Sequence, residues 1–241
     1  MESDITILIP TSPIKSHPDT KIIDKCIDSI RNYLPTSRII IMADGVRPEQ
    51  EEFTERYQEY LLRLQKKYPE IDFHICKTHR HQAGMTKDTL PEVKTPLIFF
   101  VEHDWEMIGP IPILGLAQII LSGKINLVRF CLDEWMIPEH AYMMLGDEHF
   151  GDIRITHTYQ WSQRPQLCTT QLYIDLLNKL PDDANIMIEE FVYGLVTSDY
   201  EMTKSNTYKL AIYTPGMKRT NHLDGREGES KFDELMNYGT R

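Results

Sequence analysis

The sequence lacks the glycine-rich signatures of the commonest nucleotide-binding loops. Neither G-x-x-x-x-G-K-[ST] nor G-x-G-x-x-G occurs in its 241 residues. The first pattern cradles phosphates in P-loop proteins, and the second marks the dinucleotide-binding fingerprint. A P-loop enzyme and a dinucleotide-binding protein of that kind are therefore excluded.

The chain also has few cysteines, and they lie far apart. Cys26, Cys76, Cys131 and Cys168 include no C-x-x-C pair. A zinc ribbon needs close cysteine pairs to complete its tetrahedral site, so that interpretation is poor. Without a secretion signal, reduced and mostly buried thiols are the usual state. This cysteine usage fits a reducing cytoplasm, and the cytoplasm of a host cell equally well.

Positive charge is in deficit, and long apolar runs are missing. Lys and Arg number 26 against 36 Asp and Glu, which gives a net charge of −10. Such a balance argues against a nucleic-acid coat or a polybasic membrane binder, although a local basic pocket remains possible.

The longest apolar runs, residues 96–101 and 111–121, are too short or too interrupted to span a bilayer. The acidic N-terminus lacks the layout of a signal peptide, so we expect a cytoplasmic protein without a transmembrane segment.

The residues that are present supply a large core. Hydrophobic residues make up 41% of the chain and aromatic residues 10%, which disfavours disorder. The length suits one domain. Because no repeat, low-complexity tract or linker is visible, we expect a single domain over residues 1–241.

Apolar strands and amphipathic helices alternate through the first hundred residues. Strands are expected at residues 4–10, 37–43, 72–76 and 96–101. Helices are expected at residues 21–33 and 48–68, and from Met85 onward. This alternation predicts an α/β fold with a mostly parallel central sheet and helices on both faces. The less regular second half favours strands at 127–132 and 208–213 and helices at 171–180 and 187–197.

Ligands of such sheets bind beyond the carboxyl ends of the strands. The sharpest feature there is the acid pair Glu102 and Asp104, which directly follows the apolar residues 98–101. Buried carboxylates cost desolvation energy unless something compensates them, and a divalent cation with oxygen ligands is a natural partner. The plainer alternative is an acidic loop whose side chains are solvated.

Three further groups have both a functional and a structural interpretation. Asp44 follows the second strand, where it is either an ordinary Asp-Gly turn residue or an acceptor for a base or ribose. The loop at residues 79–84, together with Lys87, either neutralises phosphate or is simply polar surface. Glu189 and Glu190 open an apolar helix, where they either favour its dipole or present a general base to a cleft.

The polar residues near the end of the chain and one tryptophan also have both a functional and a structural interpretation. His222 and Arg226 lie in residues 221–226 and either supply a metal ligand and a phosphate contact or belong to a flexible terminus. Trp161 stands among polar residues, which suits sugar binding, but a core tryptophan is about as common an explanation.

In their order, these features resemble the GT-A glycosyltransferases, and most closely the family-2-like inverting group. They are a first strand that ends in Pro10 and Thr11, Asp-Gly after the second strand, a Gly-containing loop after the third, and acid-x-Asp after the fourth. The resemblance covers most of residues 4–106 and, more loosely, residues 160–226.

The resemblance implies the roles of the donor site. The Asp-x-Asp motif of the family corresponds to residues 102–104, with Asp104 as the direct Mn²⁺ or Mg²⁺ ligand, Glu102 beside it and His222 completing the site. Asp44 matches the acid that contacts the nucleotide base. Further contacts with the nucleotide sugar are expected from the resemblance or from position in the sequence. These residues are Pro10, Thr11, Arg80, Gly84, Lys87, Glu102, His103 and Arg226. The usual Asn-x-Gly loop is altered here to residues 82–84.

The resemblance also implies the reaction. Glu189 and Glu190 look like the Glu-Asp pair of the family, whose second acid is the catalytic base, so Glu190 is the first candidate and Glu189 the second. Trp105 and Trp161 are expected to stack on acceptor sugars. The implied activity is metal-dependent, inverting transfer of a sugar from a nucleotide-diphosphate sugar, with UDP as the expected nucleotide, to a hydroxyl of a glycan. Residues 1–106 would bind the donor, and residues 107–241 the acceptor.

Two other functions compete with this one. A sugar-nucleotide pyrophosphorylase could share the nucleotide-binding sheet, but it would usually show a Gly-rich loop after the first strand, and residues 11–20 contain no Gly. A non-catalytic module that binds nucleotide sugars or glycans would need neither metal nor base.

Overall fold

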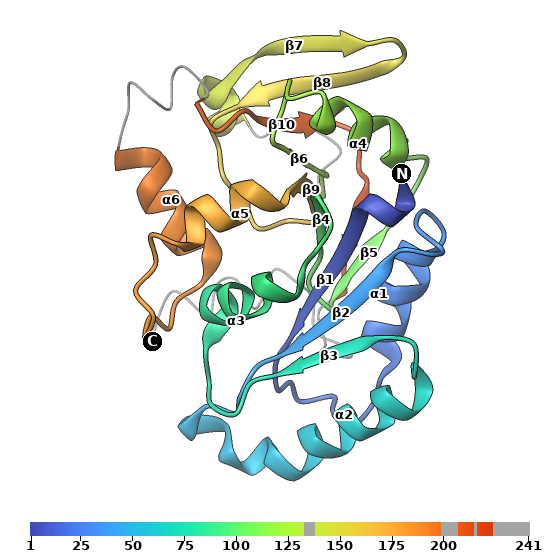
Figure 1. Ribbon diagram of the computed structural model, residues 1–241, viewed down its shortest axis with the longest axis vertical. Coiled ribbons are helices and arrows are strands. Elements are labelled where there is room, and N and C mark those ends of the chain that lie inside the picture. The colour runs from blue at the N-terminus through green and yellow to red at the C-terminus, as the bar shows by residue number, and fades with distance from the viewer. Residues whose placement is uncertain (133–137, 199–206, 215, 224–241) are drawn as a thin grey trace.

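The computed structural model describes residues 1–132, 138–198, 207–214 and 216–223. Its centre is a nine-stranded sheet with the order β3-β2-β1-β4-β9-β6-β10-β8-β7 (Figure 1). In that order the strands are Asp72–Ile75, Arg38–Ala43, Ile5–Thr11, Leu97–Phe100, Gln166–Thr169, Leu127–Arg129, Leu210–Tyr213, Ile153–Thr158 and Met144–Phe150. Only β9 and β8 run against the other strands of this sheet. The expected α/β class with a mostly parallel sheet is thus confirmed.

A second, two-stranded sheet connects the late chain to the residues that follow β4. It pairs β5 (Trp105–Met107) with β11 (Thr220–His222) in antiparallel fashion. In this register His222 stands opposite Trp105. The pairing therefore brings residue 222 to the carboxyl end of β4.

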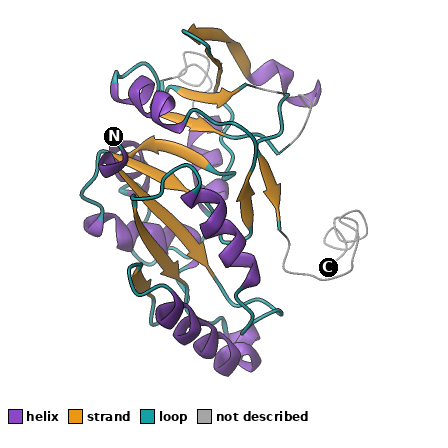
Figure 2. Cartoon of the chain, turned by 90° about the vertical axis from the view of Figure 1, so that its right-hand side faces the viewer, coloured by secondary structure: helices purple, strands orange, loops and turns teal. Residues whose placement is uncertain are grey.

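Helices cover both faces of the large sheet (Figure 2). They are α1 (Lys21–Arg31), α2 (Thr54–Lys67), α3 (His81–Thr89), α4 (Ile113–Leu121), α5 (Thr170–Leu177) and α6 (Ile188–Ser198), with 3₁₀ turns at Glu2–Asp4, Pro48–Phe53, Leu90–Glu92 and Pro138–Met143. Apolar residues of α1, α2 and α4 form one buried cluster with the sheet, and those of α3, α5 and α6 form another. The sheet is therefore the middle of three layers.

Side-chain periodicity explains this layering. In β1, Ile7 belongs to the cluster under α1 and α2, whereas Leu8 belongs to the cluster under α3, because successive strand residues point to opposite faces. Both are fully buried, so the strand is apolar throughout. In α1, buried Ile23, Ile27 and Ile30 recur at helical spacing and place one stripe against the sheet.

The first four strands end within one residue of their expected bounds, but several elements differ from expectation. Residues 48–53 form a 3₁₀ turn rather than the start of α2, with Pro48 at its beginning and a kink at Gln50. Helix α3 begins at His81, four residues before the expected Met85. Strands β5, β7, β8, β9 and β11 and helix α4 were not expected, because they are short, irregularly patterned or made by long-range pairing.

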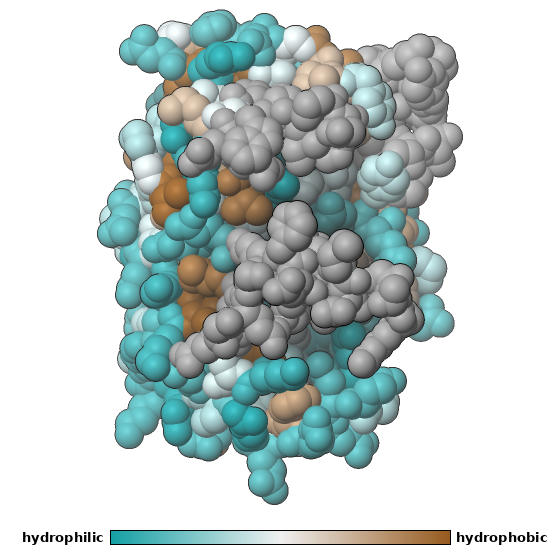
Figure 3. Space-filling model, turned by 180° about the vertical axis from the view of Figure 1, so that it is seen from behind, coloured by the Kyte–Doolittle hydropathy of each residue, from teal (hydrophilic) through white to brown (hydrophobic). Residues whose placement is uncertain are grey.

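The composition led to expectations about the cysteines and about membrane-spanning segments. All four cysteines are free thiols, and Cys26 and Cys168 are buried. Within the described ranges, no helix is both long and apolar enough to cross a membrane. Hydrophilic residues predominate over the lower end of the molecule in Figure 3, where α2 lies.

Candidate active site

A cleft of about 300 Å³ opens at the carboxyl ends of β1, β2 and β4. This is the edge at which parallel α/β sheets bind their ligands. Its lining residues come from the ends of these strands, from α3 and from the turn before α6: Pro10, Thr11, Ser12, Ile14, Asp44, Arg47, His81, Gln82, Met85, Glu102, His103, Asp104 and Met187. Six residues expected at the donor site are thereby brought together, namely Pro10, Thr11, Asp44, Glu102, His103 and Asp104.

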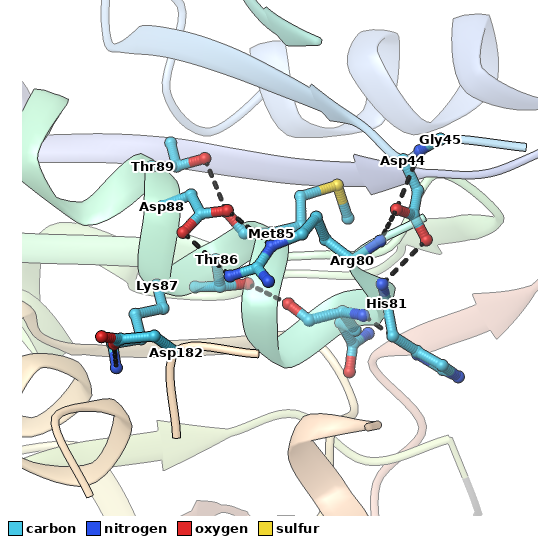
Figure 4. A network of polar contacts seen from close by, with 11 residues as sticks. Asp44, Gly45, Arg80, His81, Met85, Thr86, Lys87, Asp88, Thr89 and Asp182 are labelled. Atoms are coloured by element: carbon cyan, nitrogen blue, oxygen red, sulfur yellow. Dashed lines mark hydrogen bonds and ion pairs between the residues drawn. The ribbon is translucent and has the colours of Figure 1, made fainter. Parts of the chain in front are cut away.

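Asp44 joins the end of β2 to the start of α3 (Figure 4). Its Oδ1 accepts hydrogen bonds from the backbone N–H groups of Gly45 at 2.8 Å and Arg80 at 2.7 Å. Its Oδ2 accepts from the backbone N–H of His81 at 3.1 Å and lies 2.7 Å from Nδ1 of His79. The side chain is only 4% exposed. Both carboxylate oxygens are therefore engaged by the chain itself, and Asp44 holds the loop after β3 in place.

The structure does not bring Arg80, Gly84 or Lys87 to the cleft. Arg80 donates to Asp88 at 2.8 Å and Lys87 to Asp182 at 2.7 Å, and Figure 4 shows both side chains directed away from the His81 ring. Gly84 is buried where α3 meets the segment before α6, and a Cβ there would lie 3.1 Å from the carbonyl oxygen of Ala184. Arg80 is thus paired within α3, whereas Lys87 and Gly84 contact the segment before α6, and none of the three lines the cleft.

Asp104 and His222 meet beside the cleft although 118 residues separate them. Nε2 of His222 lies 3.0 Å from Oδ2 of Asp104. Burial opposes ionisation of Asp104, but the hydrogen bond from His222 and the nearby His103 keep its pKa below the usual value. Oδ1 of Asp104 is buried and has no hydrogen-bond partner among the described residues. An ionised carboxylate with one unsatisfied oxygen, next to an imidazole, fits a divalent cation.

Glu102 has a different environment from Asp104. One of its oxygens accepts from the side-chain amide of Gln82, and the other accepts from Nε1 of Trp105 at 3.1 Å. Burial and the neighbouring Asp104 raise the pKa of Glu102, while these two donors and His222 oppose the shift. Each oxygen of Glu102 accepts one hydrogen bond and keeps a second lone pair, so its present partners do not prevent it from ligating a cation. Among the residues that the structure describes, no group of three or more acidic, His or Cys side chains is arranged to hold a metal.

The first strand contributes its backbone to the cleft floor. The carbonyl oxygen of Pro10 accepts from the backbone N–H of His103 at 3.2 Å and lies 3.3 Å from its Nδ1. Nε2 of His103 is buried without a partner. The carbonyl oxygen of Thr11 accepts from Asp44 N–H at 2.9 Å and from the Tyr57 hydroxyl at 3.2 Å. These bonds fix β1, β2 and the residues after β4 relative to one another.

The acid pair of α6 lies at the other side of the cleft. Met187, which lines the cleft, directly precedes the helix, and both Glu189 and Glu190 are exposed. The pKa of the His81 imidazole is lowered by its burial and by the nearby Arg47 and His79, and the carboxylates of Asp44 and Glu190 oppose that shift. Glu190 is thus near enough to influence the pKa of a cleft residue.

The tryptophans expected to stack on sugars are core residues. Trp161 is 3% exposed, donates to Gln163 and packs near Tyr173. Trp105 is 7% exposed, donates to Glu102 and packs against the ring of His222. Since neither indole presents an open face, the structure does not support the expected stacking on acceptor sugars.

The sequence analysis did not predict every residue that lines the cleft, and some predicted residues lie outside the described ranges. Arg47 and Met187 line the cleft without having been expected there. Arg47 follows Asp-Gly by two residues at the end of β2, which is the signal that could have found it. Arg226 lies outside the described residues, as do Asp133, Glu134 and Asp224, which are the next acids to consider as the base if neither Glu189 nor Glu190 serves.

Comparison with known proteins shows the fold. No protein-family model and no curated protein matches the chain. Among solved structures it is similar to residues 1–349 of S. aureus TarS, with a TM-score of 0.52 and 12% identity over 90% of this chain and 59% of that one. It is also similar to the mannosyltransferase PcManGT from Pyrobaculum calidifontis, solved with GDP-Man and Mn²⁺, with a TM-score of 0.56 and 12% identity over 93% of this chain and 58% of that one.

The chain shares its fold with these two proteins, one of which is a mannosyltransferase. The resemblance found in the sequence is thus confirmed at the level of fold. The chain spans less than three fifths of each of the two proteins just compared. Its glycosyltransferase fold and the cleft geometry are the basis for a proposal about activity.

Proposed function

We propose that this protein is a glycosyltransferase that moves a sugar from a nucleotide-diphosphate sugar to a hydroxyl of a glycan. One observation carries the proposal: Asp104, between β4 and β5, and His222, in β11, converge to 3.0 Å beside a cleft at the carboxyl edge of a GT-A-like sheet. The buried, unpartnered Oδ1 of Asp104 supports a ligand at this point. An acidic loop with solvated side chains would leave no such atom.

Asp104 and His222 would hold Mn²⁺ or Mg²⁺. These cations are commonly bound through one or two protein ligands together with substrate phosphates. When bound, the cation would neutralise negative charge that develops on the departing diphosphate. The mannosyltransferase with the similar fold was solved with GDP-Man and Mn²⁺. Without the cation, the hydrogen bond to His222 orients the Asp104 carboxylate; with it, Nε2 of His222 would lose its proton, and both side chains would offer lone pairs to the metal. Glu102 accepts hydrogen bonds from Gln82 and Trp105.

Glu190 would act as the general base. It would accept the proton of the acceptor hydroxyl, which attacks the anomeric carbon on the face opposite the diphosphate and inverts its configuration. The position of Glu190 on the first turn of α6, near enough to oppose the lowering of the His81 pKa, supports this role. General-base assistance accelerates reactions by roughly 10²–10⁴-fold. Glu189 is the second candidate.

The two halves of the chain would bind different substrates. Residues 1–106 supply most of the cleft and would bind the donor, with a UDP-sugar as the expected substrate. Residues 107–241 supply His222 and α6 and would bind the acceptor. Since β11 from the second half pairs with β5 from the end of the first, the halves would act as one domain.

Calorimetry with nucleoside diphosphates tests the donor site. Wild-type protein should bind a nucleoside diphosphate more tightly with Mn²⁺ than with EDTA. Asp104→Asn and His222→Ala should lose most of that difference, whereas Asp152→Asn, in the exposed turn between β7 and β8, should keep it. Equal affinities with Mn²⁺ and EDTA in the wild-type protein would contradict the metal assignment.

Turnover distinguishes the proposed enzyme from the other functions. A screen of nucleotide sugars by thermal shift, with and without Mn²⁺, should identify the donor, because a ligand of the native state raises its melting temperature. Transfer or hydrolysis of that donor would support the enzyme. Binding without turnover of any donor would favour a non-catalytic module, and formation of nucleotide sugar from sugar phosphate would favour a pyrophosphorylase.

A further inference from the structure

A groove of about 620 Å³ lies at the edge of the sheet opposite the cleft. It is bordered by the residues that precede β4 and β6, by the end of β9, and by helices α4 and α5 (Figure 1). Strand β4 runs parallel to β1, and β9 runs against both β4 and β6. The groove is therefore at the amino edge of the parallel strands, whereas the cleft is at their carboxyl edge.

The side of the groove that α4 forms is apolar and exposed. Residues 107–123 contain no charged side chain. Leu121 lines the groove and is 45% exposed, and Leu114, which lies on the same side of the helix, is 38% exposed. Pro96 and Ile174 continue the apolar lining toward α5. Exposed apolar patches of this kind mark surfaces that contact another molecule.

Three exposed lysines surround this apolar strip. Lys94 lines the groove, and its Nζ donates to the carbonyl oxygen of Pro91 at 2.6 Å. Lys124 directly follows Gly123, which also lines the groove. Nζ of Lys209 donates to the carbonyl oxygen of Gly123 at 2.8 Å. These ammonium groups thus contact backbone carbonyls or water, and no carboxylate of the described ranges lies within ion-pair distance of them.

The unpaired lysines contrast with the acidic character of the whole chain, whose net charge is −10. Elsewhere lysines pair with acids, as Lys87 does. The acids near the groove have other partners: Glu92 pairs with His74 at 2.7 Å, and Asp175 accepts a hydrogen bond from the side-chain amide of Gln171 at 2.7 Å. Positive charge at the groove is therefore left for an outside anion.

Leucines flanked by ammonium groups match the surface of an anionic bilayer. Proteins that lie on membranes bury apolar side chains at the boundary between headgroups and acyl chains, and they place lysines at the headgroups. Each lysine near an anionic leaflet adds to the attraction. Leu114 is not part of the groove lining, so the apolar surface extends beyond the groove. This extent favours a broad membrane surface over a single acidic peptide.

We propose that this edge of the molecule docks on a membrane that contains anionic phospholipids. Leu114 and Leu121 would enter the acyl boundary, and Lys94, Lys124 and Lys209 would contact headgroup phosphates. The cleft, at the opposite edge of the sheet, would then face away from the membrane. The proposal goes beyond the proposed function and uses no residue of the cleft.

Cosedimentation with vesicles in EDTA and low salt tests the role of the lysines. Wild-type protein should bind vesicles of phosphatidylcholine with phosphatidylglycerol about tenfold more tightly than vesicles of phosphatidylcholine alone, and added salt should weaken this binding. The double variant Lys94→Gln/Lys209→Gln should lose most of the difference. Its control, Lys66→Gln/Lys77→Gln, changes the net charge equally at exposed positions on α2 and after β3, and it should keep the difference.

The leucines are tested by a second matched pair. Leu121→Ser should weaken binding to the anionic vesicles severalfold, because an apolar side chain no longer enters the acyl boundary. Leu62→Ser, at a leucine that is 66% exposed on α2, should bind as the wild-type protein does. Melting temperatures establish that each variant is folded. If Leu121→Ser does not fold, the lysine variants still decide the proposal.

Three results would overturn the proposal. The first is no binding of wild-type protein to the anionic vesicles, which is expected if the groove takes an acidic protein instead. The second is equal binding to the two kinds of vesicle. The third is an equal loss in the groove variants and their controls. Nucleotide binding by the same proteins is measured separately, so failure here leaves the proposed function standing, and failure of nucleotide binding leaves membrane docking standing.

Discussion

The carboxylate of Asp44 accepts the backbone N–H of Arg80 at 2.7 Å, which ties the end of β2 to the start of α3. It also accepts from Gly45 and His81. Asp44→Ala leaves these buried N–H groups without their acceptor, and each unsatisfied group costs about 1–3 kcal/mol. We expect a loss of at least about 1 kcal/mol of unfolding free energy, measured by urea denaturation, together with weaker nucleotide binding because His81 is released.

The conservative variant provides the control for this prediction. Asp44→Asn keeps one oxygen acceptor for Gly45 and Arg80, so it should lose less stability than Asp44→Ala. If Asp44→Ala unfolds at the same urea concentration as the wild-type protein and loses only nucleotide affinity, the carboxylate contacts the ligand rather than the loop.

The sequence made Lys87 a candidate phosphate contact, but its ion pair with Asp182 predicts that it does not contact the ligand. Nζ of Lys87 also donates to the carbonyl oxygen of Leu180 at 2.7 Å, so the ammonium is directed to the segment before α6. Lys87→Met should leave the affinity for nucleoside diphosphates within about twofold. Calorimetry with nucleoside diphosphates in the presence of Mn²⁺ checks this, and a loss of tenfold or more would place Lys87 at the donor after all.

Buried His17 gives the protein a pH-dependent stability. The ring is 1% exposed and stacks on Tyr60 with 3.8 Å between centroids. Burial, with smaller effects of His103 and Arg56, lowers the pKa of His17 from 6.5 to about 3. Between these values the unfolded chain binds the proton and the folded chain does not, so stability falls as pH falls from 6.5 toward 3.

We expect this histidine to cost roughly 1.5 kcal/mol of unfolding free energy between pH 6.5 and pH 5. His17→Phe keeps an aromatic ring on Tyr60 and removes the titration, so its stability should depend less on pH over that interval. Urea denaturation at several pH values compares the two slopes. Identical slopes would show that other groups cause the acid sensitivity.

Local patterns were enough to predict the first half of the fold. Strands β1 to β4 are apolar, end at turn residues and alternate with helical patterns, so their bounds and their parallel order follow from short stretches of sequence. The edge at which Asp44 and Asp104 meet follows from the same rule. Strands β9 and β11 are made by pairing with residues far away in the chain, and three- or four-residue strands carry too little pattern to be seen.

Contacts between side chains explain why some candidate residues have other partners than the sequence predicts. Arg80 and Lys87 have the charge that phosphate requires, and only the positions of Asp88 and Asp182 show that this charge is already neutralised. Trp161 stands among polar residues in the sequence, yet its neighbours in space are Gln163 and Tyr173. A sequence gives the type of each side chain, whereas its direction depends on contacts that span the fold.

The acids that open α6 differ in what they face. The Glu190 carboxylate raises the pKa of His81 in the cleft, against the lowering by burial, and Glu189 does not contribute to the shift of that histidine. If Glu190 is the general base, Glu190→Gln should lower turnover by roughly 10²–10⁴-fold with little change in nucleotide affinity. An acid that only favours the helix dipole would contribute roughly 0.3–1 kcal/mol of stability and barely affect turnover.

Parallel assays of Glu189→Gln and Glu190→Gln separate these roles. The substitution to Gln is nearly isosteric and removes the proton acceptor, so the loss of transfer would report chemistry rather than packing. Near-normal transfer by Glu190→Gln with an inactive Glu189→Gln would move the base by one residue. If both variants transfer sugar normally and differ from the wild-type protein only in melting temperature, the base does not lie on α6, and the acids at positions 133, 134 and 224 become the next to test. Nucleotide affinity measured alongside distinguishes a lost base from a lost donor site, because only the latter weakens binding.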